Sequence, residues 1–533
     1  MAQVPALGYI SYYIHTDGGI ERSLKRRVRQ VNDGDEYETT QTTTKDEELE
    51  IKPIKEIERR TQEINDTEDN KKLSNVDRPT VAKEDHEINI VNTAIPAEES
   101  NDGFIKNQYI QINLDKDRKI STIQLSNGLT TSLDLQFYYY VSDDPHSLRN
   151  YVDPDNPEPF KPDRKSPGTY IFRTMDRIPV PIIDTLHTKV YKTDVVQEIH
   201  TSYSKYASLV VRVYDGRPLV EVDWMVGTIP AEDGLGKEVF IRYMTDLKND
   251  GVFYTDANGR QTVIRRRNLR GTYEPFNLDP IAGNIYPITS RIYIDDTNNM
   301  RFSIFNDRPQ SGTSLHDGSV DVILQRRILT DDAGFQAYLN VTKVVRGTHY
   351  LYLTKADYKP NRIFEKKLAK EIELHPLKFI AKNVTKEKWM LMQNEFSALK
   401  TKLPVGVHVL TIQEWDNNTL LLRLENYLEK SDVPKSGNKH VNIKDLFVHI
   451  KINKIKETML AGHIWLEDWQ PLRWQLKNNF FKNFNDYYAN STVEYVKSED
   501  LKPVEQVDLN KGITLTPQQI RTFVVWHEYI NEI

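Results

Sequence analysis

The sequence contains a few residues whose types and spacing suggest chemistry. His15 and Asp17 have a zinc-ligand spacing, but no third ligand is near, which favours a turn aspartate beside a surface histidine. Adjacent aspartates occur at Asp295-Asp296 and at Asp331-Asp332. Two carboxyl groups that act together as nucleophile and acid must lie about 5 Å apart. Neighbours on a strand point to opposite faces, so we expect these pairs at strand ends or turns.

Other clusters are compatible with binding. Arg265-Arg-Arg267 with Arg270 could hold an anion, although a short basic run is more often a solvated face or a set of salt bridges. The segment Gly-Leu-Gly-Lys at 234–237 lacks the spacing of the phosphate-binding motif G-x-x-x-x-G-K-[ST] and is interpreted as a loop. Three tryptophans could stack on sugar rings, although buried sandwich tryptophans are more common: Trp465, Trp469 and Trp474. No G-x-S-x-G motif anchors a serine triad.

Composition excludes several classes of protein. Lys plus Arg total 71 against 77 Asp plus Glu, a formal charge of −6, so we expect no nucleic-acid partner. The absence of cysteine excludes disulfides, a catalytic thiol, cysteine-ligated zinc and iron–sulfur clusters. No apolar run approaches the roughly 18 residues of a membrane span. The first residues resemble no signal peptide, so we expect neither a membrane partner nor a signal peptide in this chain.

Five asparagines lie in the N-glycosylation pattern Asn-x-Ser/Thr: Asn65, Asn340, Asn383, Asn417 and Asn490. A chain this rich in asparagine, serine and threonine contains about as many matches by chance. The pattern alone therefore identifies candidates for glycosylation and does not establish a glycoprotein.

The composition of the chain changes along its length. Residues 4–15 predict one strand, whose partners must lie far downstream or on chain absent from this sequence. Residues 21–100 are dense in charge and hold a single aromatic residue, Tyr37, which predicts a disordered insert. From about 101 onward, short β-type runs separated by turn signals predict a large antiparallel assembly. A Lys- and Glu-rich stretch near 355–375 indicates a second boundary.

Two hairpins are the clearest local predictions. One spans 209–226 and turns at Asp215-Gly216, with alternate residues Val220, Val222, Trp224 and Val226 on one face. The other spans 253–263 and turns at Asn258-Gly259. Further strands are predicted at 290–294, 301–305, 320–324, 337–342, 406–412, 419–424, 446–452 and 521–526, and short helices at 385–399 and 516–520.

Several blocks occur in an order that resembles a known family. They include Val4–Tyr9, Pro-Gly-Thr-Tyr-Ile-Phe-Arg at 167–173, Phe253–Arg260, Asp307–Gly318 and, near the end, Leu403–Leu410. Together they resemble the carboxy-terminal half of the lysosomal-type α-mannosidases, glycoside hydrolase family 38. The resemblance covers 4–15 and about 101–525.

The resemblance implies a mainly β fold, a galactose-mutarotase-like β-supersandwich followed by a smaller β-sandwich. It divides the chain into four parts. These are a strand of an otherwise missing small β domain at 1–20, the charged insert at 21–100, the central supersandwich at 101–365 and the carboxy-terminal sandwich at 366–533.

The resemblance also implies an activity, namely hydrolysis of terminal α-mannose from N-glycans or oligomannose with retention. In the family, a zinc ion and an aspartate nucleophile belong to an amino-terminal barrel that has no matching motif here. We therefore expect no catalytic residue, no metal ligand and no cofactor in this chain, and no activity of the chain alone. The implied partners are that barrel and a mannose-containing oligosaccharide, and the implied location is lysosomal or secretory. A homo-oligomer stays open.

One residue is carried over from the family. Tyr170 matches a tyrosine that reaches the sugar site, where a phenol can donate a hydrogen bond, and the alternative is an ordinary core tyrosine. The family's Asp-Asp-x-Arg-Gly loop matches 331–335, where the arginine is missing. This loss favours an alternative function, a barrel-less descendant that binds carbohydrate or is structural.

Overall fold

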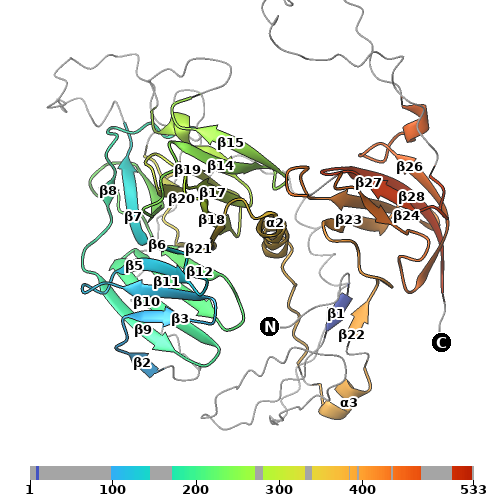
Figure 1. Ribbon diagram of the computed structural model, residues 1–533, viewed down its shortest axis with the longest axis horizontal. Coiled ribbons are helices and arrows are strands. Elements are labelled where there is room, and N and C mark those ends of the chain that lie inside the picture. The colour runs from blue at the N-terminus through green and yellow to red at the C-terminus, as the bar shows by residue number, and fades with distance from the viewer. Residues whose placement is uncertain are drawn as a thin grey trace, which may run out of the picture. The chain divides into compact units, whose positions relative to one another are not determined.

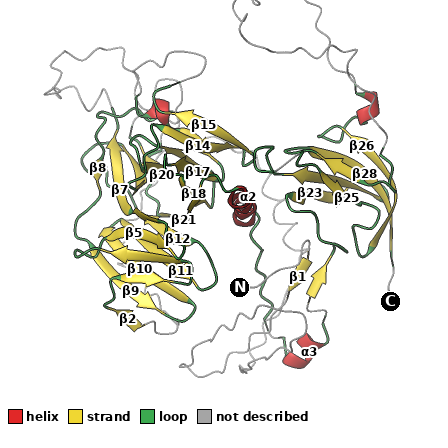
Figure 2. Ribbon diagram, in the orientation of Figure 1, coloured by secondary structure: helices red, strands yellow, loops and turns green. Residues whose placement is uncertain are grey.

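The computed structural model describes residues 8–10, 98–143, 168, 171–269, 280–329, 339–382, 384–392, 395–433, 436–469 and 507–530. Antiparallel strands are the main regular structure of these residues (Figures 1 and 2). The chain divides into two compact units, one of residues 1–96 and 380–396 and the other of 97–379 and 397–533. The prediction of a mainly β protein is confirmed.

A ten-stranded antiparallel sheet is the largest element of the second unit. In spatial order its strands are β15 (Gln261–Arg266), β14 (Val252–Ala257), β17 (Arg291–Asp295), β18 (Met300–Asn306), β21 (Val345–Lys355), β12 (Val220–Val226), β11 (Ala207–Tyr214), β10 (Val196–Ser204), β9 (His187–Lys192) and β2 (Glu98–Ser100).

Two further sheets share its core. A six-stranded sheet runs β16 (Tyr286–Ile288), β19 (Gln310–Thr313), β20 (Ser319–Arg327), β13 (Lys237–Met244), β7 (Asp134–Val141) and β8 (Val180–Pro181). A four-stranded sheet runs β3 (Phe104–Lys106), β4 (Ile110–Leu114), β5 (Ile120–Leu125) and β6 (Thr130–Ser132). Buried residues from all three sheets form one continuous cluster, including Ile112, Phe137 and Trp224. This layered arrangement confirms the predicted β-supersandwich.

The predicted hairpins form where their turn chemistry indicates. On β12, Val220, Val222, Trp224 and Val226 are buried and alternate with half-buried residues, as the period of two requires. Gly216 has a φ of 75° in the turn between β11 and β12. In the turn between β14 and β15, Asn258 and Gly259 have φ of 55° and 69°, the left-handed region that these residues tolerate.

A smaller sandwich follows. Its main sheet runs β23 (Val407–Glu414), β24 (Thr419–Asn426), β28 (Ile520–Tyr529) and β26 (Ile450–Thr458), and a second sheet pairs β25 (Lys439–Val441) with β27 (Ile513–Leu515). Its own buried cluster includes Leu422, Val441, Leu515 and Phe523. The predicted smaller β-sandwich is therefore confirmed.

Helix α2 (Lys359–Glu373) is the one long helix of the described residues. Pro360 lies in its first turn, where the missing N–H removes no intrahelical bond. The sequence predicts a domain boundary here and no helix. Two of the four buried residues of α2, Glu365 and Lys366, are charged, so they interrupt the apolar stripe by which a helix is recognised. No helix among the described residues is long and apolar enough to cross a membrane.

Two local predictions are wrong, at 337–342 and 516–520, and two others have wrong bounds. Residues 339–342 of the predicted strand 337–342 are irregular, and the rest lies outside the described residues. The helix predicted at 385–399 is reduced to α3 (Lys386–Met390), and β22 (Glu395–Ser397) follows. The segment 516–520 is a turn in which Gln518 has a φ of 60°. The strand predicted to begin at 446 begins at Ile450.

The first unit contains a distant strand pair. β1 (Gly8–Ile10), inside the predicted strand 4–15, forms a two-stranded sheet with β22. Its partner therefore lies far downstream, one of the two expected arrangements. A two-stranded sheet is marginally stable by itself. Of the charged insert 21–100, only 98–100 lies within the described residues.

Candidate functional site

Two described residues close to Tyr170 in the sequence contact an arginine of the six-stranded sheet. Tyr170 itself lies outside the described residues, but Gly168 and Phe172 on either side are described. The Arg326 guanidinium of β20 donates a hydrogen bond of 3.2 Å to the Gly168 carbonyl. Phe172 is 2% exposed, and the Arg326 guanidinium lies 5.3 Å from its ring centroid. One arginine therefore holds both flanks of the predicted substrate-facing residue.

Arg326 is itself fixed by a buried carboxylate. Its Nε donates to Oε1 of Glu238 on β13 at 2.8 Å, and Glu238 is 1% exposed. Burial raises the pKa of Glu238, whereas the neighbouring Arg326 lowers it. Removing one partner of such a pair would leave a buried uncompensated charge. Because Glu238 is enclosed and bonded to Arg326, it positions the segment and is no exposed acid or base.

The same sheet carries a second buried ion pair beside an aromatic stack. Nε and Nη2 of Arg242 donate to the two carboxylate oxygens of Asp321, each at 2.7 Å. The Phe240 ring stacks between Tyr138 and Tyr140, at centroid distances of 5.7 and 5.0 Å. Phe172 packs in the same buried cluster as Tyr140 and Phe240.

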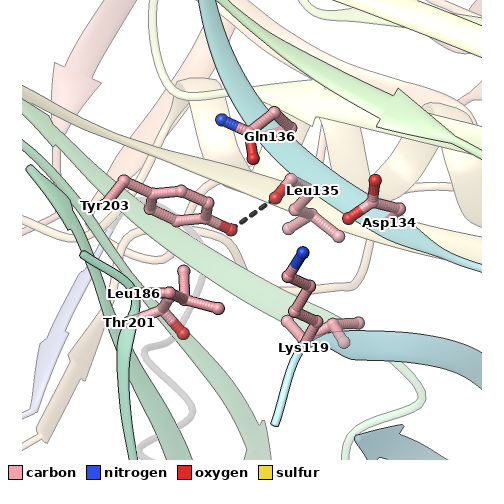
Figure 3. A pocket seen from close by; sticks show the side chains of 8 residues that line it. Lys119, Asp134, Leu135, Gln136, Leu186, Thr201 and Tyr203 are labelled. Carbon is pink, nitrogen blue, oxygen red and sulfur yellow. Dashed lines mark hydrogen bonds between the residues drawn. The ribbon is translucent and has the colours of Figure 1, made fainter. Parts of the chain in front are cut away.

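A small cavity lies where β7 and β10 meet the start of β5. Figure 3 shows the Tyr203 hydroxyl donating to the Leu135 carbonyl, with Lys119, Asp134 and Thr201 around the space. The cavity has a volume of about 10 Å³, room for one water molecule. It is far too small for a sugar ring.

A wider groove of about 350 Å³ runs along 106–108 and 193–197. Its amide side chains already hold the neighbouring loops. Asn107 donates to the carbonyls of Tyr214 and Arg217, and Gln108 accepts from the Gly216 N–H. Asn107 and Gln108 of the groove are therefore engaged in holding the fold.

The acidic pairs behave as strand-end and turn residues where they are described. Asp295 accepts two hydrogen bonds from Arg301, and Asp296 accepts from the N–H groups of Lys248 and Asn298. This confirms the structural interpretation of 295–296. The pair 331–332, together with His15 and Asp17, lies outside the described residues. Within the described residues, no group of three or more His, Asp or Glu side chains could hold a metal ion.

Two arginines of the basic run are engaged within the fold. Arg265 donates to the Thr255 hydroxyl and lies 4.2 Å from the Tyr286 ring centroid. Arg267 pairs with Asp317 at 2.6 Å. Arg266 is exposed, and Arg270 lies outside the described residues.

The tryptophans divide between packing and exposure. Trp465 stacks on Trp526 with centroids 6.3 Å apart, and Lys456 lies 4.3 Å from its ring. Trp469 is 42% exposed, and Trp474 lies outside the described residues. Among the sequons, Asn340 and Asn417 are described and exposed, whereas Asn65, Asn383 and Asn490 lie outside.

The sequence reasoning missed a charged network under helix α2. The Glu365 carboxylate is fully buried and accepts from Arg291 at 3.0 Å, Arg301 at 3.1 Å and Ser303 at 2.6 Å. The next residue, Lys366, pairs with Glu429, which lies just beyond β24. The partners are scattered along the sequence, so no local pattern predicts this network.

Comparison with known proteins identifies the central domain. Residues 105–334 match the family described as the glycosyl hydrolases family 38 C-terminal domain. This chain carries the C-terminal domain of glycosyl hydrolase family 38. The anchored segment at Gly168 and Phe172 and both buried ion pairs, Glu238–Arg326 and Arg242–Asp321, lie within the matched residues.

Two relatives show how far the similarity extends. The chain is 33% identical over 444 residues to lysosomal alpha-mannosidase of Bos taurus, which covers 80% of this chain and 41% of the relative. It is 35% identical over 375 residues to the Homo sapiens protein of that name, covering 68% of this chain and 35% of the relative. The chain therefore spans less than half the length of the curated relatives it matches.

One solved structure is similar in shape. An alpha-mannosidase from Enterococcus faecalis V583 superposes with a TM-score of 0.49 and 12% identity, over 81% of this chain and 43% of that chain.

Proposed function

We propose that this chain is the carboxy-terminal, mainly scaffolding portion of an α-mannosidase that removes terminal α-mannose from N-glycans or oligomannose with retention. The observation that carries the proposal is the 33% identity to a lysosomal alpha-mannosidase along 80% of this chain. Family 38 resemblance alone indicates the retaining mechanism, in which one carboxylate acts as nucleophile and another as acid and base.

In this proposal the catalytic zinc and the nucleophile belong to an amino-terminal barrel. The described residues of this chain do not fit a zinc ion. The buried carboxylates Glu238, Asp321 and Glu365 are bonded to arginines, and both ring nitrogens of buried His349 are hydrogen-bonded, to Tyr243 and Gln310. Zinc prefers three or four converging His, Cys or carboxylate ligands. We therefore derive no catalytic step through zinc in this chain.

The contribution of this chain is positioning. In the proposal Tyr170 donates a hydrogen bond from its phenol to a hydroxyl of the sugar. Arg326 holds the Gly168 carbonyl and packs on Phe172, the described residues on either side of Tyr170 in the sequence. A donor that is preorganised binds the sugar without first losing the entropy of a mobile loop.

The location proposed for the protein is lysosomal or secretory. Its support is the similarity to proteins named lysosomal alpha-mannosidase in cattle and humans. A secretory route would expose the sequons to glycosylation.

A second candidate function is a barrel-less descendant that binds carbohydrate or serves as a structural protein. The feature that favours it is the loop at 331–335, which lacks the arginine of the family's Asp-Asp-x-Arg-Gly sequence. In that case the two sandwiches fold and act without a catalytic partner.

Hydrolysis of an aryl α-mannoside tests the first proposal. We expect the purified 533-residue chain to be inactive, and a preparation that also contains the amino-terminal barrel to show zinc-dependent hydrolysis with retained configuration. Zinc-dependent hydrolysis by this chain alone would contradict the proposed division of labour. Inactivity of both preparations would favour the barrel-less alternative.

A further inference from the structure

The hairpin between β23 and β24 ends in a tight five-residue turn. Glu414 pairs with Leu420, the Trp415 N–H donates to the Thr419 carbonyl at 3.0 Å, and the Thr419 N–H donates to the Asp416 carbonyl at 2.7 Å. Asn418 has a φ of 55°. The bond from Thr419 to Asp416 closes a four-residue turn whose third residue, Asn418, is left-handed, a conformation that asparagine tolerates. Its sequence, Trp-Asp-Asn-Asn-Thr, contains the sequon of Asn417.

Trp415 is held in place although its ring is exposed. Its side chain is 44% exposed. A Cβ atom at Gly462 would lie 3.3 Å from two carbons of the indole, so the edge of the ring packs against the Gly462 backbone. Gly462 has a φ of 82°, which favours glycine at this contact. A large apolar ring is thus presented to solvent in a fixed position.

Asn417 lies two residues after Trp415, at the tip of the same turn. Its side chain is exposed, and no hydrogen bond within the described structure engages its amide group. The backbone N–H of Asn417 is tied to the Asp416 carboxylate at 2.7 Å, and the Thr419 hydroxyl donates to the Asp416 carbonyl at 2.8 Å. The amide is therefore free while the turn around it is rigid.

The other described sequon differs. The Asn340 side-chain oxygen accepts a hydrogen bond of 2.9 Å from Arg327, and the described residues around it, 339–344, are irregular. Spacing alone does not separate the two sites, because Tyr338 precedes Asn340 by the same two positions as Trp415 precedes Asn417. The turn and the free amide single out Asn417.

We propose that Asn417 is an N-glycosylated residue whose first N-acetylglucosamine packs on the exposed ring of Trp415. This inference rests on the secretory location proposed above. The apolar face of a pyranose carries C–H groups of partial positive charge, which are attracted to the electron-rich face of an indole. The turn holds the Asn417 backbone, and Trp415 packs against Gly462 before the sugar arrives, so little entropy of the indole side chain is lost on contact.

The covalent step is a substitution at the sugar's anomeric carbon. The donor is a lipid-linked oligosaccharide diphosphate, used by an oligosaccharide transferase. Asn417 Nδ2 forms a bond to C1 of N-acetylglucosamine, the bond from C1 to the diphosphate oxygen breaks, and the lipid diphosphate leaves. The amide loses one proton to a base of the transferase, and no oxidant or reductant is needed.

Site-resolved mass spectrometry tests occupancy. The protein, isolated from its source, is treated with peptide-N-glycosidase in ¹⁸O water, which converts each glycosylated asparagine to labelled aspartate. We expect label at Asn417, at higher occupancy than at Asn340. Label at other sequons with none at 417 would overturn this inference and leave the secretory location standing. Absence of label at every sequon would overturn both, while the α-mannosidase activity remains to be judged by its own assay.

Variants test the packing of the sugar on Trp415. With the Trp415→Ala protein we expect faster enzymatic release of the glycan under native conditions and a lower melting midpoint of the glycosylated form. Trp469→Ala is the matched control, since this tryptophan of the same domain is 42% exposed and precedes no sequon. In the Asn417→Gln background, which carries no glycan there, Trp415→Ala should change the midpoint less. Equal effects of Trp415→Ala with and without the glycan would overturn the proposed contact.

Discussion

Glu365 and Lys366 are adjacent in helix α2 and bond to different sandwiches. Glu365 accepts from Arg291 and Arg301 of the ten-stranded sheet, whereas Lys366 pairs with Glu429 beyond β24. The two ends of the network are joined, because Arg291 donates to the Thr262 hydroxyl at 2.8 Å and that hydroxyl donates to Glu429 at 2.6 Å. One turn of helix thus links the central β-supersandwich to the terminal sandwich.

Loss of the Glu365 charge should be strongly destabilising. Glu365→Gln leaves Arg291 and Arg301, both buried, without their shared carboxylate. We expect the free energy of unfolding to fall by about 3–5 kcal/mol, measured by urea denaturation. The control is Glu371→Gln on the same helix, whose side chain is 53% exposed and pairs with Lys367. It should change stability by less than about 1 kcal/mol, and equal losses would contradict the assigned role of the network.

The strands of the described sheets could largely be predicted from the sequence, whereas the buried ion pairs between them could not. Hairpins around 216 and 259 follow from local turn chemistry, which the sequence displays directly. Helix α2 was missed because its buried face holds Glu365 and Lys366, whose partners are remote. The same limit applies to the site, since Arg326 and Glu238 are 88 positions apart in sequence. Tyr170 was proposed as a sugar-binding residue from the family resemblance. No spacing rule predicts the contact between Arg326 and the neighbouring Gly168.

Acid should weaken the fold through His349. This histidine is fully buried, and burial lowers its pKa from 6.5 to about 3. Its Nδ1 faces the Tyr243 hydroxyl at 2.7 Å and its Nε2 faces Gln310 at 2.9 Å. As the pH falls below about 6.5, this histidine takes up a proton in the unfolded chain but stays neutral in the folded protein. Its contribution to the free energy of unfolding is therefore complete above pH 6.5 and is lost as the pH falls toward 3.

Urea denaturation between pH 7 and 4 checks the role of His349. The linkage predicts a slope of up to about 1.4 kcal/mol per pH unit from this one group. His349→Gln should be less stable at pH 7 but lose less stability on acidification. An unchanged slope in the variant would show that other groups govern acid sensitivity.

A methyl group at Gly318 should not be tolerated. Gly318 has a φ of 75°, and an added Cβ would lie 2.3 Å from the Thr245 carbonyl oxygen and 2.8 Å from that of Leu247. We expect Gly318→Ala to lower the free energy of unfolding by about 1–3 kcal/mol. Gly103→Ala is the control, because no atom lies within 4 Å of its added Cβ. Comparable thermal midpoints of the two variants would argue against this backbone contact.

The phenol of Tyr170 should matter to the proposed activity. In the complete enzyme, Tyr170→Phe removes one donor, and we expect kcat/KM for an aryl α-mannoside to fall by roughly tenfold. Arg326→Leu should lower the same constant, since it releases the flanking Gly168 carbonyl. Tyr109→Phe, at a 42% exposed tyrosine elsewhere, serves as the control. Full activity of Tyr170→Phe would assign that residue to the core instead.

The central claim is that this chain works with a catalytic barrel. Mass spectrometry of the native protein, purified from its source with α-mannosidase activity followed through each step, tests it most directly. We predict that the active fractions contain peptides of this chain together with peptides of an amino-terminal barrel, either continuous with Val4 or copurifying as a second chain. Recovery of this chain free of any barrel peptides, with the activity in other fractions, would contradict the account.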